Sequence, residues 1–325
     1  MLNAERHAYD HHDALQEDYA DRGWTDGLPV VAPTPAKVEA FLDAAGLKAG
    51  EVLGEVPTRE VVVTAEHAAI NAVMAGCKQE YMPVVAAAVR AHLHEKANCH
   101  STTGTLCGAA QVVVVNGPVR KEIEIACEGA CFGPGFRANA TIGRALRLVI
   151  RNVCRAIPDF LDRASFSSPL RYSFCFGENE EGSPWLPMHV ERGFAPDQST
   201  VTVHSIMHFV SAIDFTARTP EAVLDTILAT LRRYGVFSDR FLGDGQNVML
   251  VVGPEHMRFF AEEGWSKDDM RGYLWPKIQK TGAGERPIML GQPEGMLITA
   301  AGGPGMAETW LLIPHLAWAI TEPIS

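Results

Sequence analysis

Two stretches of this chain align with each other without a gap, and they constrain the fold more than any other feature. Residues 62–89 match residues 251–278 at an offset of 189, with six identical positions that include Glu66-His67 and Glu255-His256. Each stretch is followed by an apolar run that ends in Gly-Pro. This order predicts a strand-helix-helix-strand unit used twice, with the two copies facing each other across a shared cleft.

Strand-like and helix-like patterns alternate along the whole chain. Residues 219–235 show the helix pattern well, because Thr219 can cap the helix, Pro220 can begin it and Gly235 can end it. The alternation predicts an α/β fold with three layers and a mixed sheet. We expect four parts: an N-terminal arm and helix (1–50), a first α/β unit with a glycine-rich loop (51–165), a connecting segment (166–200) and a second α/β unit (201–325).

The composition narrows the classes of partner. A net charge of −11 and a pI near 5.5 argue against a nucleic-acid or anionic-membrane partner. No apolar run approaches the roughly 20 residues that span a bilayer, and the charged first residues do not resemble a signal peptide. The seven cysteines do not suit a secreted disulfide framework. We therefore expect a cytoplasmic homo-oligomer or hetero-oligomer that acts on a small-molecule substrate.

Cys77 is the predicted reactive thiol. It lies at the break between two predicted helices, where the second copy has Ser266. A helix N-terminus and the neighbouring Lys78 would lower its pKa, and a thiolate is the form that acts as a nucleophile. Glu80 would transfer protons, and Glu66 or His67 would orient the site from the end of the preceding strand. A buried structural cysteine is the alternative.

The segment 132–144, FGPGFRANATIGR, predicts an anion-binding loop. Free N–H groups at a helix opening can hold a carboxylate or phosphate, and arginines can add forked hydrogen bonds. The segment lacks both the Walker pattern and G-x-G-x-x-G, and simple turn chemistry is the structural alternative. Glycines that follow the strands near 116 and 303 occupy positions where ligands of open α/β sheets bind. The predicted substrate-binding residues are Arg137, Asn139, Thr141, Arg144, Asn116, Gly117 and Gly303.

A metal site is a further alternative, although no cofactor is firmly predicted. His204 and His208 are expected on one face of their segment, and Glu178 or Asp214 could complete a ligand set. No H-E-x-x-H or C-x-x-C spacing supports this set. The acidic loop 177–182 has two interpretations, a pair of carboxylates for acid and base catalysis or a solvated turn.

Five segments resemble a poorly characterised bacterial family. They are GWTDGLPVVAPTP (23–35), AVMAGCKQEYMPVVAAAV (72–89), VVVVNGPV (112–119), FGPGFRANATIGRALRLVIRNV (132–153) and GENEEGSPWLPMHVERGF (177–194). Members of this family occur beside, or fused to, a small domain with a Sec/Cys-Gly-Ser-Cys motif, the UGSC-type (seleno)proteins. The resemblance implies redox or C–X bond chemistry on a small organic acid or amine, and its motifs point to Cys77, Glu80, Tyr81, Arg137, Asn139 and Arg144.

Three functional hypotheses follow. The first is an enzyme that acts on a small carboxylate-bearing molecule by thiol-dependent chemistry, as a lyase or by reductive C–X cleavage, in a cleft between two halves. The chain contains no Cys-Gly-Ser-Cys of its own, so the second is a non-catalytic or half-site subunit of a UGSC-type complex. The third is a metal-dependent hydrolase or lyase that uses His204 and His208.

Overall fold

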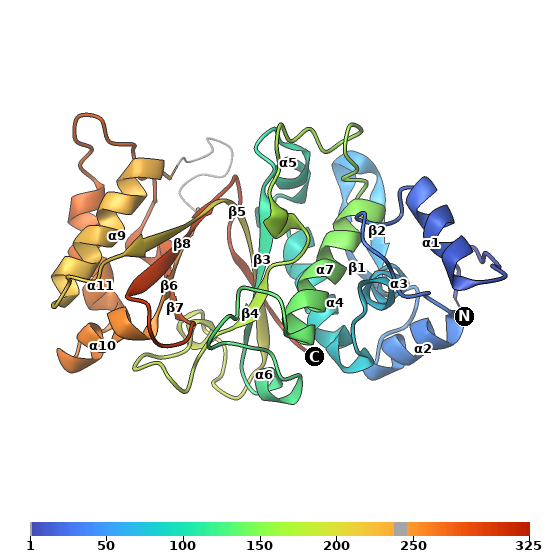
Figure 1. Ribbon diagram of the computed structural model, residues 1–325, viewed down its shortest axis with the longest axis horizontal. Helices are drawn as coiled ribbons and strands as arrows, with labels where there is room; N and C mark the ends of the chain where they lie inside the picture. Colours follow the sequence, from blue (N-terminus) through green and yellow to red (C-terminus); the bar gives the residue numbers. More distant parts are fainter. Residues whose placement is uncertain (1, 237–245) are drawn as a thin grey trace.

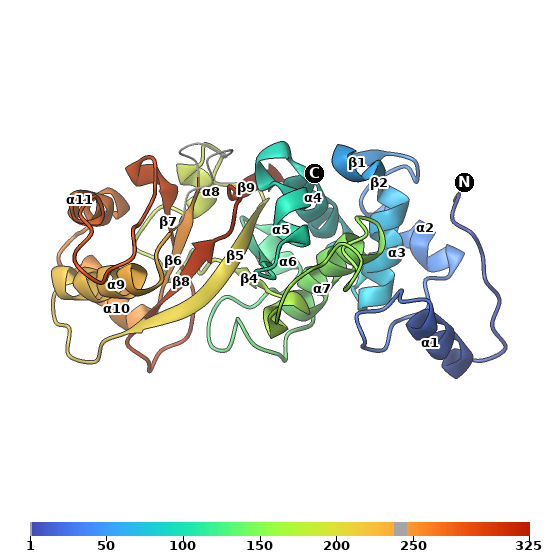
Figure 2. The ribbon, with the colours of Figure 1, turned by 90° about the horizontal axis from the view of Figure 1, so that it is seen from above.

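The protein has an α/β fold in which helices flank both sides of a mixed β-sheet (Figure 1). The computed structural model describes residues 2–236 and 246–325. Helices from the first half of the chain lie at one end of the long axis, and helices from the last third lie at the other (Figures 1 and 2). No helix within these two ranges is long and apolar enough to cross a lipid bilayer.

The main sheet joins both halves of the chain. Its strands lie in the order β4 (Cys175–Gly177), β3 (Ala110–Asn116), β5 (Thr200–Ile213), β8 (Glu308–Pro314), β6 (Val248–Val252) and β7 (Met296–Ala300), and β9 (Ile320–Pro323) also pairs with β5. The pairs β3–β4 and β6–β7 are parallel, whereas the other pairs are antiparallel. The prediction of a mixed sheet is therefore confirmed.

The sheet curls, so that its two halves share an inner core. Val112 and Val114 of β3 pack in one apolar cluster with Met249 and Val251 of β6, whereas the residues that alternate with them face the helices. The Asn179 N–H donates to the Ala300 carbonyl at 2.8 Å, which joins the ends of the two edge strands. Helices, curled sheet and helices follow one another along the long axis, in agreement with the three layers predicted from the sequence.

Residues 2–152 contain most of the helices, together with a two-stranded hairpin. They include α1 (His12–Asp21), α2 (Pro35–Ala44), α3 (Ala65–Ala75), α4 (Met82–Leu93), α5 (Cys99–Gly104), α6 (Val119–Glu122), α7 (Arg137–Asn152) and a hairpin of β1 (Val52–Val56) and β2 (Val61–Thr64). Buried alanines let α3 pack closely against α7. Residues 2–10, which we call the arm, run along the outside of this part to α1 (Figure 2).

The remaining helices are α8 (Met188–Glu191), α9 (Pro220–Tyr234), α10 (Pro254–Glu262) and α11 (Lys267–Ile278). The two aligned stretches do share the predicted order of elements. However, β2 pairs with β1 outside the main sheet, whereas β6 pairs with β7 within it. The predicted pseudo-repeat is therefore not confirmed, because the same local order leads to different long-range pairing.

Candidate functional site

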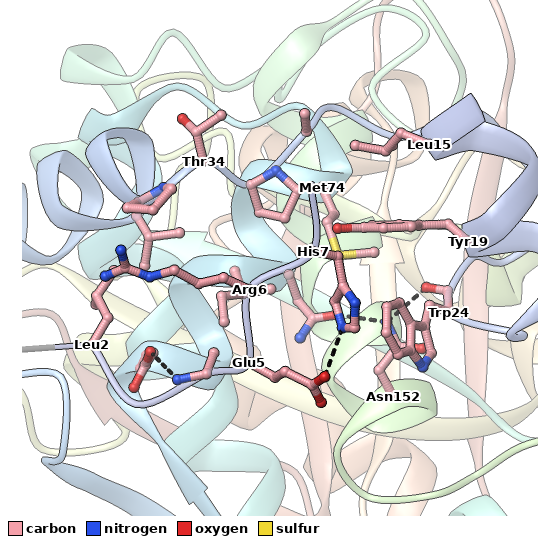
Figure 3. Close-up of a pocket in the computed structure, with 18 of the residues that line it drawn as sticks. Leu2, Glu5, Arg6, His7, Leu15, Tyr19, Trp24, Thr34, Met74 and Asn152 are labelled. Atoms are coloured by element: carbon pink, nitrogen blue, oxygen red, sulfur yellow. Dashed lines mark hydrogen bonds and ion pairs between the residues drawn. The ribbon is translucent and has the colours of Figure 1, made fainter. Parts of the chain in front are cut away.

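A cavity of about 540 Å³ lies under the arm, and we call it the arm pocket (Figure 3). Its walls come from the arm, α1, the segment 24–35, α2 and α3, together with the last residue of α7. Its volume is in the range of pockets that enclose small organic molecules. Two residues predicted from the sequence, Glu66 and His67, line it.

Glu66 anchors the arm over this pocket. Its carboxylate accepts hydrogen bonds from the Asn3 N–H at 2.8 and 3.0 Å and from the Ala4 N–H at 2.9 Å. The side chain is 4% exposed. Because the carboxylate is occupied by backbone donors, Glu66 forms part of the pocket's construction and is poorly placed to transfer protons.

Apolar and aromatic side chains make most of the pocket wall. The Tyr19 and Trp24 rings meet edge to face with centroids 5.3 Å apart, and Tyr9 meets Tyr19 at 6.0 Å. Figure 3 shows Tyr19 reaching from α1 towards Met74, with Leu15 and Trp24 on either side. Burial raises the pKa of Tyr19, so its phenol is neutral at ordinary pH. This wall suits an apolar or aromatic molecule.

His67 offers the pocket a hydrogen-bond donor. Its Nδ1 accepts from the Thr64 N–H at 3.2 Å, in a capping box that begins α3. The proton of the neutral ring must therefore be on Nε2. Burial lowers the pKa of His67, and protonation of Nδ1 would also remove its bond to Thr64. The predicted catalytic imidazole is consequently a neutral donor in this geometry.

Asn152, which was not predicted from the sequence, offers the matching acceptor. Its Nδ2 donates to the Trp24 carbonyl at 2.9 Å and to Asn71 Oδ1 at 2.8 Å. Its own Oδ1 is buried and has no hydrogen-bond partner in the described part of the chain. A buried acceptor without a partner carries a desolvation cost that a ligand donor could remove.

Cys77 does not have the environment predicted for it. The thiol is buried and donates to the Thr141 carbonyl at 3.3 Å, and burial raises its pKa to about 12. Lys78 and Glu80 are exposed to solvent, and Tyr81 is buried. The prediction of a lowered pKa is therefore wrong, since desolvation disfavours the thiolate. Cys77 follows the C-terminal end of α3, whereas Glu66 and His67 lie in its first turn. At a rise of 1.5 Å per residue, the helix separates Cys77 from these two residues by about 15 Å.

The thiol whose pKa is lowered is Cys99. A hydrogen bond from Cys154 lowers the pKa of Cys99 well below its ordinary value, and the nearby His92 acts in the same direction. Both sulfurs are buried. Neither cysteine lines the arm pocket.

The predicted anion-binding residues bind the protein itself. Arg137 donates to the carbonyls of Gly76 at 3.0 Å and Cys77 at 3.5 Å, and Arg144 forms a forked pair with Asp26 at 2.8 Å for each bond. Asn139 exchanges hydrogen bonds with Ala126 and donates to the Cys131 carbonyl, and Thr141 donates to the Arg137 carbonyl. In this structure these groups fix the loop and its helix.

Asn116 and Gly117 lie at the carboxyl ends of the parallel strands β3 and β4. Asn116 Nδ2 donates to Glu178 at 2.5 Å and to Glu180 at 3.0 Å, and the Gly117 N–H donates to Glu180 at 2.8 Å. Arg120 pairs with Glu180 at 2.8 Å. The acidic loop is therefore a partly buried ion-pair network and not a solvated turn.

Gly303 lines a separate cavity of about 260 Å³ at the carboxyl ends of β6 and β7. A Cβ at this position would lie 2.7 Å from the Gly129 Cα, so only glycine allows the two loops to meet. Gly303 shares this cavity with Cys131, whose pKa burial raises to about 11. The predicted substrate-binding residues thus occupy three separate places.

His204 and His208 lie on opposite faces of β5, contrary to the prediction. A β-bulge between Ile206 and His208 shifts the register by one residue, which turns the later side chain over. His204 is buried, and its pKa is lowered to about 4 by burial, whereas the His208 ring packs against Tyr234 at 5.1 Å. No group of three potential metal-ligating side chains occurs among residues 2–236 and 246–325.

Comparison with known proteins does not change this assignment of sites. No family model, no curated protein and no solved structure matches the chain. The resemblance to the UGSC-associated family therefore stays a prediction. We assign the candidate site to the arm pocket from its geometry. Two residues predicted from the sequence, Glu66 and His67, line it, and so do Tyr19, Trp24 and Asn152, which were not predicted.

Proposed function

We propose that this protein binds a small, largely apolar organic molecule in the arm pocket. The observation that carries the proposal is the buried Asn152 Oδ1: this residue lines an apolar cavity of about 540 Å³, and its oxygen has no hydrogen-bond partner among residues 2–236 and 246–325. Pockets of this size with apolar walls and a few convergent polar groups are typical ligand sites.

The polar groups define the chemistry of the ligand. Asn152 Oδ1 is an acceptor that a donor on the ligand can satisfy, and His67 Nε2 can donate to an acceptor. An aromatic or alicyclic body would contact Tyr19, Trp24 and Met74. We infer a neutral molecule of small size that carries an amine, amide or hydroxyl group.

This proposal favours a pocket-bearing subunit over a thiol-dependent enzyme. Cys77 does not line the pocket and its pKa is raised, and Glu66 is occupied by the arm. Catalysis on the bound molecule would then require groups from a partner, for which a UGSC-type protein is the expectation from the resemblance.

Fluorescence titration with N-phenyl-1-naphthylamine tests the proposal, because this neutral probe combines aromatic rings with one N–H donor. We expect saturable binding by the full chain. Ile70→Trp places a larger side chain in the wall of the cavity and should weaken binding. Asn152→Leu should weaken binding by about tenfold, the effect of one hydrogen bond of about 1.4 kcal/mol.

Leu106→Trp is the matched control, since it also adds a tryptophan but at a residue that is 67% exposed and outside the pocket. Its binding should equal that of the unmodified protein. Thermal melts of all variants would establish that they fold. Unchanged binding in Ile70→Trp, or no saturable binding in the unmodified protein, would contradict the proposal.

A further inference from the structure

A second cavity, of about 410 Å³, lies between α7 and the segment 156–172. Arg147 and Arg151, one turn apart on α7, line it together with Arg171, and we call it the arginine pocket. It shares no lining residue with the arm pocket. Its ligand chemistry is therefore a separate question.

The carboxylates of the arginine pocket are already paired. Asp162 binds Arg171 at 2.6 Å, and Asp26 binds Arg144 at 2.8 Å. Arg171 also donates to Ser167 Oγ at 2.9 Å. These pairs use the negative charge that the protein supplies to the cavity.

Arg147 and Arg151 have no such partner. Within residues 2–236 and 246–325, no carboxylate oxygen lies within 4.0 Å of either guanidinium group. Arg147 donates to the Arg171 carbonyl at 3.1 Å and to Gln111 Oε1, and Arg151 donates to the Gly23 carbonyl at 3.2 Å. Neutral acceptors hold both side chains in place, and the charges of Asp162 and Asp26 act on them only from beyond ion-pair distance.

Arg147 is also almost fully buried, with 7% of its surface exposed. Burial, reinforced by the charge of Arg171, lowers its pKa to about 9, so the guanidinium is still charged at neutral pH. A buried charge without a counter-charge is strongly unfavourable in a folded protein. The chain as a whole carries a net charge of −11, so this local positive surplus does not follow from a basic composition.

We propose that the arginine pocket binds a small organic anion through Arg147 and Arg151. Guanidinium groups recognise carboxylate and phosphoryl oxygens with forked hydrogen bonds, and an anion would supply the missing counter-charge. The cavity has room for more than the anionic group. Ala156, Pro158 and Pro169 also line it, so an apolar body can follow the charge.

Isothermal titration calorimetry on the full chain tests this site. The probes are benzoate, phenyl phosphate and the neutral benzamide, which share a ring and differ in charge. We expect at least one anion to bind at a single site, with the stronger of the two identifying a carboxylate or a phosphoryl ligand. Benzamide should bind at least tenfold more weakly, because it lacks the charge that strengthens each hydrogen bond.

Two variants and one control assign the binding to these residues. Arg151→Gln should weaken anion binding by roughly tenfold or more, the usual effect of losing a charged hydrogen bond. Arg163→Gln changes an exposed arginine of the neighbouring segment that does not line the cavity, and it should bind like the unmodified protein. Ile70→Trp, which narrows the arm pocket, should leave anion binding unchanged.

Arg147→Met separates a binding role from a structural one. We expect the loss of anion binding with little change in the ligand-free melting temperature, because removing a buried charge that lacks an ion pair offsets the loss of the donor to Gln111 Oε1 and to the Arg171 carbonyl. Anion affinity that is the same in Arg151→Gln and in the unmodified protein would overturn the proposal. Benzamide binding as tight as that of both anions, or no anion binding at all, would overturn it too.

Discussion

The arm pocket and the arginine pocket lie on either side of residues 23–26, but they differ in how their buried charged groups are paired. Arg151 holds the Gly23 carbonyl on one side, and Asn152, the next residue of α7, holds the Trp24 carbonyl on the other. In the arm pocket the one buried carboxylate, Glu66, is matched by backbone N–H groups. In the arginine pocket two guanidinium groups have no ion-pair partner in the part of the chain that the structure describes. Unmatched groups, more than burial alone, therefore indicate the ligand that each cavity would accept.

The contrast is sharpest between two arginines of α7. Arg144 has a forked ion pair with Asp26, whereas Arg147, three residues later, forms no ion pair with any carboxylate of residues 2–236 and 246–325. Burial alone would raise the pKa of Asp26, but the hydrogen bonds and charge of Arg144 lower it. The pair fastens the segment between the two cavities to α7. Arg144 is thus a structural residue, and Arg147 is a binding residue in our proposal.

Arg144→Leu should give the largest effect on stability. It would leave the Asp26 carboxylate, whose side chain is 13% exposed, without its partner. We expect the free energy of unfolding to fall by about 3 kcal/mol, the cost of breaking a buried ion pair from one side. Urea denaturation would measure it, with Arg163→Leu as the exposed control. A loss in Arg144→Leu no larger than in the control would remove the structural distinction between Arg144 and Arg147.

Glu66→Ala should give a smaller effect that is confined to the arm pocket. Removing the carboxylate leaves the N–H groups of Asn3 and Ala4 unpaired and releases the arm, which we expect to cost about 2 kcal/mol. Limited proteolysis should then cut within residues 2–10, and the naphthylamine probe should bind more weakly. Glu39→Gln, at an exposed position of α2, is the control. An arm as protected in Glu66→Ala as in this control would show that Glu66 is not its anchor.

The fold could be predicted from local patterns, but the pairing of its strands could not. Thr219, Pro220 and Gly235 bound α9 at the residues that their chemistry indicates. Strand pairing depends on contacts far apart in the sequence, and for this reason two stretches with the same local order join different sheets. The bulge before His208 is a similar case, because a one-residue shift in register leaves no clear mark in the sequence.

The candidate sites were predicted only in part, for the same reason. Glu66 and His67 do line a cavity, but the predicted lowering of the Cys77 pKa is wrong because burial outweighs the hydrogen bond to Thr141 and the charge of Arg137. The sequence of α7 does indicate the charge of the arginine pocket. Arginines recur at helical spacing (144, 147 and 151) between apolar residues in RALRLVIRN, which places three positive charges on one face of an amphipathic helix.

His67→Gln should give the smallest effect, visible only in the pH dependence of stability. Burial lowers the pKa of His67 below the ordinary value of about 6.5, so below that pH the unfolded chain binds more protons than the folded one. His67 should therefore destabilise the fold as the pH falls from about 6.5 through its folded-state pKa. Glutamine keeps an acceptor for the Thr64 N–H and does not titrate. The variant should thus lose less stability than the unmodified protein between about pH 7 and pH 5, as measured by urea denaturation. Identical pH profiles for the two proteins would mean that His67 is not held neutral by the arm pocket.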